Sequence, residues 1–408
     1  MRTLILPAIL AALLSLNGCK SANKSEQKAL DSLAAANGDT TLSSTTSSAE
    51  TGRWSADRAN AWYSKEPFLV GANYIPANAI NELEMFQAET FDPKTIDKEL
   101  ALAEGIGMNT MRVFLHDLLW QDSTGFKKRL DQFLTICDKH KIRPMLVLFD
   151  SCWDPAPKLG KQHAPTPGIH NSGWVQSPGA AALKDPSQYP RLAAYVKGVV
   201  SAFKDDKRIL AWDMWNEPDN TNGNSYGKNH LKTELPDEEK KTLVRNLLPQ
   251  VFQWSRAAGA SQPLTSGVWV YRTPADWQDS TKWTPIERVQ FDNSDIITFH
   301  QYSKPEDLEK VIPALETFGR PVICTEYMAR GVNSKFQTHL PIAKKAKVGM
   351  INWGFVAGKT QTFLPWDSWQ KPYVNGREPA VWFHEVFKQD GTPVDPAETA
   401  AIKQATGK

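Results

Sequence analysis

The chain has 408 residues, which is enough for one large domain or two ordinary ones. Its hydrophobic content of 41% and charged content of 23% are typical of a soluble globular protein. The formal net charge of +2 gives no basic surplus, so we expect no nucleic-acid partner.

The N-terminal segment is predicted to be a targeting signal rather than part of the fold. Arg2 precedes an apolar run over 4–16, which is too short to span a membrane as a mature helix. The letters "LNGC" follow at 16–19 and resemble the bacterial lipobox, in which the cysteine is lipidated. This resemblance implies a signal peptide over 1–18 and a lipid anchor on Cys19, and therefore a bacterial membrane lipoprotein exposed to the periplasm or at the cell surface. An ordinary secretory signal with a chance cysteine is the alternative.

The segment after the lipobox is rich in Ser, Thr, Ala and Lys and has almost no large apolar residue. Such a composition cannot bury enough surface to order itself, so residues 19–53 are predicted to be the lipidated cysteine and a flexible tether. We expect the folded domain over 54–395, with 396–408 as a short polar helix or fraying tail. The cysteines beyond the lipobox lack metal-binding spacing and are predicted to be free, packed thiols: Cys137, Cys152 and Cys324.

Strand-like apolar runs alternate with helical stretches along the folded domain. The helical stretches include 126–140 and 238–259, where apolar residues recur at helical spacing. The alternation implies parallel strands, and eight such units fit an α/β fold, the (β/α)8 TIM barrel. An open doubly wound sheet is the rival, but the first strand lacks the G-x-G-x-x-G loop that such sheets usually carry. The eight predicted strands are 68–76, 108–115, 143–150, 209–218, 263–270, 295–302, 321–328 and 350–358.

One excursion, 151–188, separates the third strand from its helix. Loops of this length are usually functional or disordered. The content of Trp, His and Pro favours an ordered lid or subsite wall, and a disordered insertion is the alternative.

The chemistry of a TIM barrel lies at the C-terminal ends of its strands. Two carboxylates, Glu217 and Glu326, end the fourth and seventh predicted strands and stand 109 residues apart. Three βα units of about 31 residues would span a similar length, so the two side chains are expected to face each other across the barrel mouth. A pair of carboxyl groups about 5 Å apart is what retaining glycoside hydrolysis requires. The other polar or aromatic residues at strand ends are Arg112, Asp150, Asn216, Trp269, His300, Tyr302 and Trp353.

Three short motifs, "WNEP" at 215–218, "HQY" at 300–302 and "TEY" at 325–327, together resemble the clan A glycoside hydrolases. The likeness is greatest to glycoside hydrolase family 5, the cellulase and mannanase family, and covers roughly residues 60–390. It implies that Glu217 is the acid/base and Glu326 the nucleophile. It also implies roles around them: Asn216 would bind the sugar 2-hydroxyl, Arg112 and Tyr302 would hold Glu326 ionised, His300 would bind near the catalytic centre, and Trp353 would floor the sugar ring.

The sequence departs from this family at the third strand, where many members have a histidine and this chain reads "LFDSCW". Asp150 or Trp153 is therefore expected to occupy that space. Residues 358–369 add Lys359 and Trp366 as candidate sugar-binding groups, with plain loop packing as the alternative. None of the histidines has a partner that suggests a metal site.

The sequence thus predicts a monomeric, lipid-anchored hydrolase of β-linked oligo- or polysaccharides, of glucan, mannan or xylan type. Its mechanism would be double displacement with retention, and no cofactor or metal is required. A surface lipoprotein that binds glycan without cleaving it is the alternative. An aldolase-like barrel enzyme is disfavoured because no lysine ends a strand and no phosphate-binding glycine cluster follows the last two strands. The sequence leaves the sugar, the linkage and endo or exo action open.

Overall fold

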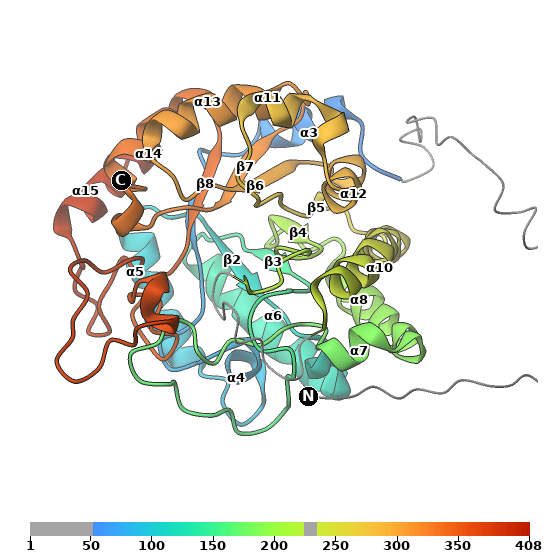
Figure 1. Ribbon diagram of the computed structural model, residues 1–408, viewed down its shortest axis with the longest axis horizontal. Helices are drawn as coiled ribbons and strands as arrows, with labels where there is room; N and C mark the ends of the chain where they lie inside the picture. Colours follow the sequence, from blue (N-terminus) through green and yellow to red (C-terminus); the bar gives the residue numbers. More distant parts are fainter. Residues whose placement is uncertain (1–51, 224–234) are drawn as a thin grey trace, which may run out of the picture. The chain divides into compact units, whose positions relative to one another are not determined.

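Eight parallel strands form the centre of the computed structural model, which describes residues 52–223 and 235–408 (Figure 1). The predicted signal segment, Cys19 and most of the tether lie outside the described residues. Each strand overlaps one of the eight predicted from the sequence. The strands are β1 Val70–Asn73, β2 Thr110–Phe114, β3 Met145–Val147, β4 Ala211–Asp213, β5 Leu264–Thr265, β6 Ile297–His300, β7 Val322–Glu326 and β8 Gly349–Asn352.

The strands follow one another around a nearly closed barrel. Their order is β5-β4-β3-β2-β1-β8-β7-β6, and every ladder is parallel. A single parallel bridge between Val268 and Phe299 joins the two ends of this sheet. There the Val268 amide donates to the Thr298 carbonyl and the His300 amide donates to the Val268 carbonyl, both at 3.0 Å. The predicted (β/α)8 barrel is therefore confirmed.

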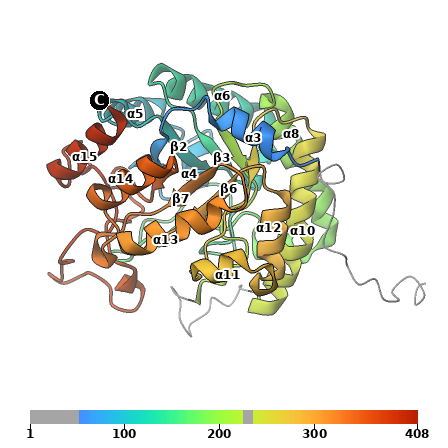
Figure 2. The same ribbon diagram turned by 90° about the horizontal axis from the view of Figure 1, so that it is seen from above.

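Helices surround the barrel, as the view from above shows (Figure 2). Local sequence explains where they begin: Asp92 caps a helix that starts at Pro93, and Thr284 forms a capping box with Glu287. The longer helices are α5 Pro93–Gly105, α6 Ser123–Lys139, α8 Tyr189–Phe203, α10 Asp237–Ala257, α12 Pro285–Asn293, α13 Pro305–Glu316, α14 Phe336–Ala346 and α15 Pro396–Thr406. The shorter ones are α3 Ala56–Tyr63, α4 Glu82–Phe86, α7 Ala180–Lys184, α11 Pro274–Gln278, and the 3-10 turns η1 Asp117–Asp122, η2 Pro186–Gln188, η3 Ser280–Lys282, η4 Arg330–Val332 and η5 Trp366–Trp369.

The two ends of the described chain pack onto the barrel. The C-terminal segment, predicted as a short polar helix or a fraying tail, forms α15, in which Ile402 is fully buried. Thr406 of that helix donates from its hydroxyl to the Ile106 carbonyl at 3.3 Å. No helix in 52–223 or 235–408 is long and apolar enough to cross a membrane. The cysteines Cys137, Cys152 and Cys324 are free and buried, as predicted.

Two long loops meet at the barrel mouth. We call residues 151–179, which follow β3, the β3 loop, and residues 353–373, which follow β8, the β8 loop; they adjoin at the lower left of Figure 1 (green and red). The backbone amide of Asn171 donates to the Thr360 carbonyl at 2.7 Å, and that of Tyr373 donates to the Gly168 carbonyl at 2.9 Å. The expected ordered wall in 151–188 is therefore present.

Candidate active site

A cavity of about 380 Å³ opens where the strands end. Its volume is at the lower end of the ~300–1,000 Å³ range of small-molecule pockets. The lining residues come from the ends of β4, β6, β7 and β8 and from the loops that follow β3, β4, β5 and β8. They are Asp150, Cys152, Trp153, His170, Trp174, Asn216, Glu217, Asn220, Asn222, Trp269, Tyr302, Glu326, Trp353, Trp366, Asp367 and Gln370.

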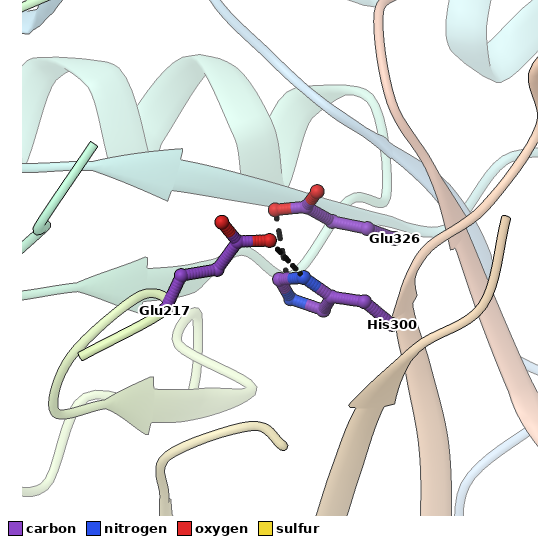
Figure 3. A group of neighbouring side chains, drawn as sticks. All are labelled: Glu217, His300 and Glu326. Atoms are coloured by element: carbon purple, nitrogen blue, oxygen red, sulfur yellow. Dashed lines mark hydrogen bonds and ion pairs between the residues drawn. The ribbon is translucent and has the colours of Figure 1, made fainter. Parts of the chain in front are cut away.

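The carboxylates of Glu217 and Glu326 face each other, and the ring of His300 lies beside both (Figure 3). One carboxylate oxygen of each glutamate and a ring nitrogen of His300 all lie within 4.8 Å of one another. Nδ1 of His300 is 2.8 Å from Oε1 of Glu217, and its Nε2 is 3.5 Å from Oε1 of Glu326. The spacing of the two carboxylates agrees with the separation of about 5 Å expected from the sequence.

Arg112 organises the floor of the site from β2. It is fully buried, and five hydrogen bonds leave its guanidinium. Nε and Nη2 donate to Oδ2 of Asp213 at 3.0 and 2.8 Å, and Nη2 also donates to Oδ1 of Asn216 at 2.8 Å. Nη1 donates to Oδ1 of Asn73 at 2.9 Å and to Oε1 of Glu326 at 3.0 Å. Since a guanidinium has five N–H groups, the donors of Arg112 are all used within the protein, which fits its expected role beside Glu326 and leaves none for a contact with substrate.

Glu326, the last residue of β7, has a charged and a neutral donor on its two oxygens. Arg112 bonds to Oε1, and the Tyr302 hydroxyl donates to Oε2 at 2.9 Å, as expected from the sequence. Burial raises the pKa of the Glu326 carboxyl, and nearby Glu217 raises it further. His300, Arg112 and Tyr302 act in the opposite direction and lower that pKa.

Glu217 lies four residues beyond the end of β4 and is held in an unusual backbone conformation. Its φ is +42°, in the left-handed region that side chains other than glycine rarely adopt. Oε2 accepts from the Asn220 side-chain amide at 2.6 Å and from the Cys152 thiol at 3.3 Å. Burial raises the pKa of the Glu217 carboxyl, and these two donors partly offset that rise. The side chains that bond to the Glu217 carboxyl belong to Asn220, Cys152 and His300, and all three are uncharged when the imidazole is neutral.

His300 ends β6 and is 7% exposed. Burial lowers the pKa of its imidazole to about 4, so the ring is neutral near pH 7. It is not among the lining residues of the cavity, so its predicted contact with substrate is replaced by contacts with the two glutamates.

Asp150 occupies the position where many family 5 members were expected to have a histidine. Its oxygens accept from the Trp174 indole at 2.7 Å, from the Asn216 side-chain amide at 2.9 Å and from the Cys152 backbone amide at 2.9 Å. Burial raises the pKa of its carboxyl. Asp150 lines the cavity, but its oxygens are occupied by these bonds, so its role is to position Asn216. Asn216 also lines the cavity and is held there in one orientation.

Aromatic side chains make up much of the remaining surface. Trp153, Trp269, Trp353 and Trp366 all line the cavity, as predicted. The Trp269 indole donates to Oδ1 of Asp219 at 2.6 Å, and Trp366 meets Tyr302 edge-on with ring centroids 5.2 Å apart. Flat indoles held in this way suit the apolar face of a sugar ring.

Lys359 does not reach the site. Its ammonium pairs with Oε1 of Glu84 at 2.6 Å, and it is not among the residues that line the cavity. The prediction that it binds sugar is therefore not supported by its position, because the β8 loop directs it toward Glu84 in α4.

Four residues that contact the predicted site were not singled out from the sequence. Asn73 and Asp213 hold Arg112, and Cys152 and Asn220 hold Glu217. Asn73 ends β1 and Asp213 ends β4, so the strand-end rule could have found both. Cys152 and Asn220 carry no comparable signal in the sequence.

Glu217, His300 and Glu326 also form a donor set that could accept a metal ion. The Arg112 guanidinium lies 3.0 Å from the Glu326 oxygen that faces His300. A metal cation on that oxygen would be repelled by the positive charge already present there. The arrangement suits proton transfer between the glutamates and a bound molecule.

A parallel eight-stranded barrel with two opposed carboxylates and fixed indoles at its mouth has the architecture of a glycoside hydrolase. The family model described as Cellulase (glycosyl hydrolase family 5) matches residues 73–371. The chain belongs to this family.

Solved structures with the same fold include three family-related enzymes. A beta-1,4-D-mannanase from Cryptopygus antarcticus is 13% identical, with 84% of this chain and 91% of that chain covered and a TM-score of 0.53. GH5_18 from Streptomyces cattleya, solved in complex with GlcNAc, is 11% identical, with coverages of 83% and 80% and a TM-score of 0.53. An endo-beta-1,4-mannanase from Thermotoga petrophila is 13% identical, with coverages of 85% and 77% and a TM-score of 0.50.

These identities show a shared fold and no more. The chain spans 59% of the length of another similar structure, the exo-beta-1,4-mannosidase Op5Man5 from Opitutaceae bacterium strain TAV5 (19% identity, 83% of this chain covered, TM-score 0.49). No curated protein sequence matches the chain.

Proposed function

We propose that the protein is a retaining glycoside hydrolase that cleaves β-linked glycans by double displacement. The observation that carries this proposal is the pair Glu217 and Glu326, whose nearest facing oxygens lie within 4.8 Å. Retaining enzymes hold their two carboxyl groups about 5 to 5.5 Å apart, whereas inverting enzymes leave about 6.5 to 9.5 Å for a water molecule.

The partners of the two glutamates support different roles for them. Glu326 has a guanidinium and a hydroxyl on its oxygens, and Glu217 has only uncharged donors. Two carboxyls at this distance do not both ionise easily, so the one beside the cation loses its proton first. We therefore assign the nucleophile to Glu326 and the proton donor to Glu217.

The neutral imidazole of His300 fits this assignment. A protonated Glu217 can donate from Oε1 to Nδ1, which leaves the ring proton on Nε2, directed toward ionised Glu326. His300 then carries no charge and makes one contact with each of the two carboxyls.

The reaction takes two steps. In the first, an oxygen of Glu326 bonds to the anomeric carbon, the bond to the leaving oxygen breaks, and Glu217 gives its proton to that oxygen. The negative charge of Glu326 disappears in the ester, so the pKa of Glu217 falls and it can act as a base. In the second step Glu217 takes a proton from water, the water oxygen bonds to the anomeric carbon, and the ester bond to Glu326 breaks.

The sugar class rests on weaker support. Two similar structures are named as β-1,4-mannanases, and another is named as a beta-glucosidase with a TM-score of 0.52. We propose β-1,4-linked mannan or glucan oligosaccharides as first substrates. We also propose that Cys19 anchors the enzyme to a bacterial membrane, a proposal supported by "LNGC" and the polar segment that follows it.

The test is turnover of aryl β-glycosides and oligosaccharides by the wild-type protein and by Glu326→Ala. We expect the variant to lose activity by a factor of at least 10⁴, roughly the cost of removing a catalytic nucleophile. Azide should partly restore turnover and give a glycosyl azide of inverted configuration. Glu316→Ala, an exposed glutamate on α13, is the control and should keep full activity. Retained activity in Glu326→Ala, or binding of glycans by the wild-type protein without cleavage, would refute the proposal.

A further inference from the structure

The β3 and β8 loops are fastened to each other by side chains as well as by backbone. Gln361 of the β8 loop accepts at Oε1 from the Gly168 amide at 3.1 Å. Its Nε2 donates to the carbonyls of Thr166 and Ile169 at 2.7 and 3.1 Å. One side chain thus bonds to three residues of the opposite loop, Thr166, Gly168 and Ile169.

A second junction lies closer to the cavity. The amide of buried His170 donates to the Ser368 hydroxyl at 3.0 Å, and its Nδ1 lies 2.9 Å from the Leu364 carbonyl. Burial lowers the pKa of His170 to about 4, so this contact does not change near neutral pH. Trp153 stacks on Trp369 with ring centroids 5.3 Å apart and planes 15° apart.

The position of the β3 and β8 loops around the barrel determines which side of the cavity they cover. In the sheet order, β2 and β1 lie between β3 and β8, so the joined loops pass over the ends of β1 and β2. Below them, Trp174 and Trp353 pack on Phe114 of β2, with centroids 5.1 and 6.0 Å from its ring. This side of the cavity is therefore a packed wall.

The other side of the cavity is formed by the ends of β4 to β6, where Glu217, Trp269 and Tyr302 line the space. Tyr271, two residues beyond Trp269, is 64% exposed. A sugar that rested on Trp353 would lie against the wall, and its leaving group, protonated by Glu217 in the proposed reaction, would extend toward β4 and β5.

The charge of the lining restricts the terminal sugar. Four acids line the cavity, Asp150, Glu217, Glu326 and Asp367, and within 52–223 and 235–408 no lysine or arginine does so. The one buried cation beneath the site, Arg112, has no N–H left for a ligand. An anionic sugar would be repelled and would find no counter-charge.

From this geometry we infer that the enzyme acts from the chain end and releases uncharged sugars from the non-reducing terminus of a β-linked oligosaccharide. This inference rests on the proposed hydrolase activity and adds exo action and a neutral glycone to it. A chain can enter the cavity only by its end, because the wall over β1 and β2 leaves no path past Trp353.

The experiment uses the whole protein and a β-1,4-linked hexasaccharide of glucose or mannose labelled at its reducing end. We expect labelled pentasaccharide first, then tetrasaccharide, with the free monosaccharide as the only unlabelled product. Labelled fragments of mixed length from the first time point would overturn the inference. Aryl β-glucosides or β-mannosides should be cleaved at least 100-fold faster than the matching β-glucuronide, and equal rates would contradict the neutral glycone.

A variant tests the wall itself. Gln361→Ala combined with His170→Ala removes the side-chain bonds of these two residues across the loop junction and should raise the ratio of internal to terminal cleavage at least tenfold. Gln250→Ala, a surface glutamine of α10, is the control and should keep the wild-type product pattern. A double variant that folds and keeps the wild-type product pattern would overturn the role of the loops. If the variant does not fold, the product series of the wild-type protein decides whether the enzyme acts from the chain end. Turnover of aryl glycosides separates the two proposals. If the protein cleaves no aryl glycoside, the proposed hydrolase activity is refuted. If it cleaves them but gives labelled fragments of mixed length from the hexasaccharide, only the exo action is refuted.

Discussion

The thiol of Cys152 lies 3.3 Å from Oε2 of Glu217, the oxygen that also accepts from Asn220. Burial and the neighbouring carboxylates raise the pKa of Cys152 well above its ordinary value. The sulfur therefore stays protonated, and its S–H group donates a hydrogen bond to the carboxylate. A donor to the ionised form of an acid lowers its pKa, so this thiol opposes the effect of burial on Glu217.

Cys152→Ala should consequently raise the pKa of Glu217. The alkaline limb of kcat/KM, where the acid must remain protonated, should move to higher pH by up to about 1 unit, since a hydrogen bond to a charged group contributes roughly 1.5 kcal/mol. Cys152→Ser keeps a donor and should leave the limb near its wild-type position. Cys137→Ala, a buried cysteine of α6, controls for packing loss. Equal limbs in all four proteins would show that the thiol does not act on the acid.

Arg112→Lys should affect the other glutamate. A lysine cannot reproduce the five hydrogen bonds of the guanidinium. The interaction between the cation and the Glu326 carboxylate should therefore weaken, and the pKa of Glu326 should rise. The acidic limb of kcat/KM should then move to higher pH, and kcat/KM should fall at least 100-fold. Arg208→Lys, a substitution in a surface ion-pair cluster, is the matched control. An acidic limb that stays in place would remove Arg112 from the control of Glu326.

Glu82 should make stability depend on pH. It begins α4, is 1% exposed, and both its carboxylate oxygens lack a hydrogen-bond partner among the described residues. Burial raises its pKa well above the usual value, and Asp150 and Asp117 raise it further. The folded state therefore binds more protons than the unfolded state above the unfolded pKa, and stability falls as pH rises through that region.

Replacing Glu82 with Gln removes this titration. Melting temperatures measured at pH 5 and pH 8 should differ less in the variant than in the wild-type protein, and the variant should be the more stable of the two at pH 8. Glu89→Gln, at an exposed position, should leave the difference unchanged. A Glu82→Gln protein with the wild-type pH dependence would contradict the burial argument.

Membrane attachment is predicted from the sequence alone. Cys19→Ser should release the protein from bacterial membranes or leave its precursor unprocessed. Fractionation and mass spectrometry of the mature N-terminus provide the measurement, with Cys137→Ser as a control that should remain attached. A mature N-terminus at another residue, with unchanged fractionation, would refute the anchor.

The barrel was predictable because its strands are buried on both faces. Such strands appear as continuous apolar runs, and each of the eight predicted runs contains or overlaps an observed strand. The residues at strand ends follow from the same pattern, which explains why Glu217, Glu326 and Tyr302 were found together. Their positions need only the strand order, which eight βα units fix by themselves.

The surroundings of the site could not be predicted in the same way. Cys152 reaches Glu217 only because the chain turns sharply after β3, where Trp153 has a φ of +72°. Asp213 ends the three-residue strand β4, which is too short to show from its sequence which face this side chain occupies. Lys359 is directed away from the cavity by its pair with Glu84, a contact between segments 275 residues apart. Each depends on loop paths or long-range packing, which local periodicity does not encode.

The left-handed backbone of Glu217 implies a conflict between folding and activity at one position. A side chain other than glycine pays about 1 kcal/mol in that region, so Glu217→Gly should melt at a higher temperature than the wild-type protein while it loses its proton donor. A laboratory selection for thermal stability alone would accept that change, and only a simultaneous demand for turnover would keep the glutamate. The proposed reaction and the stability of the fold therefore make opposite demands on this position.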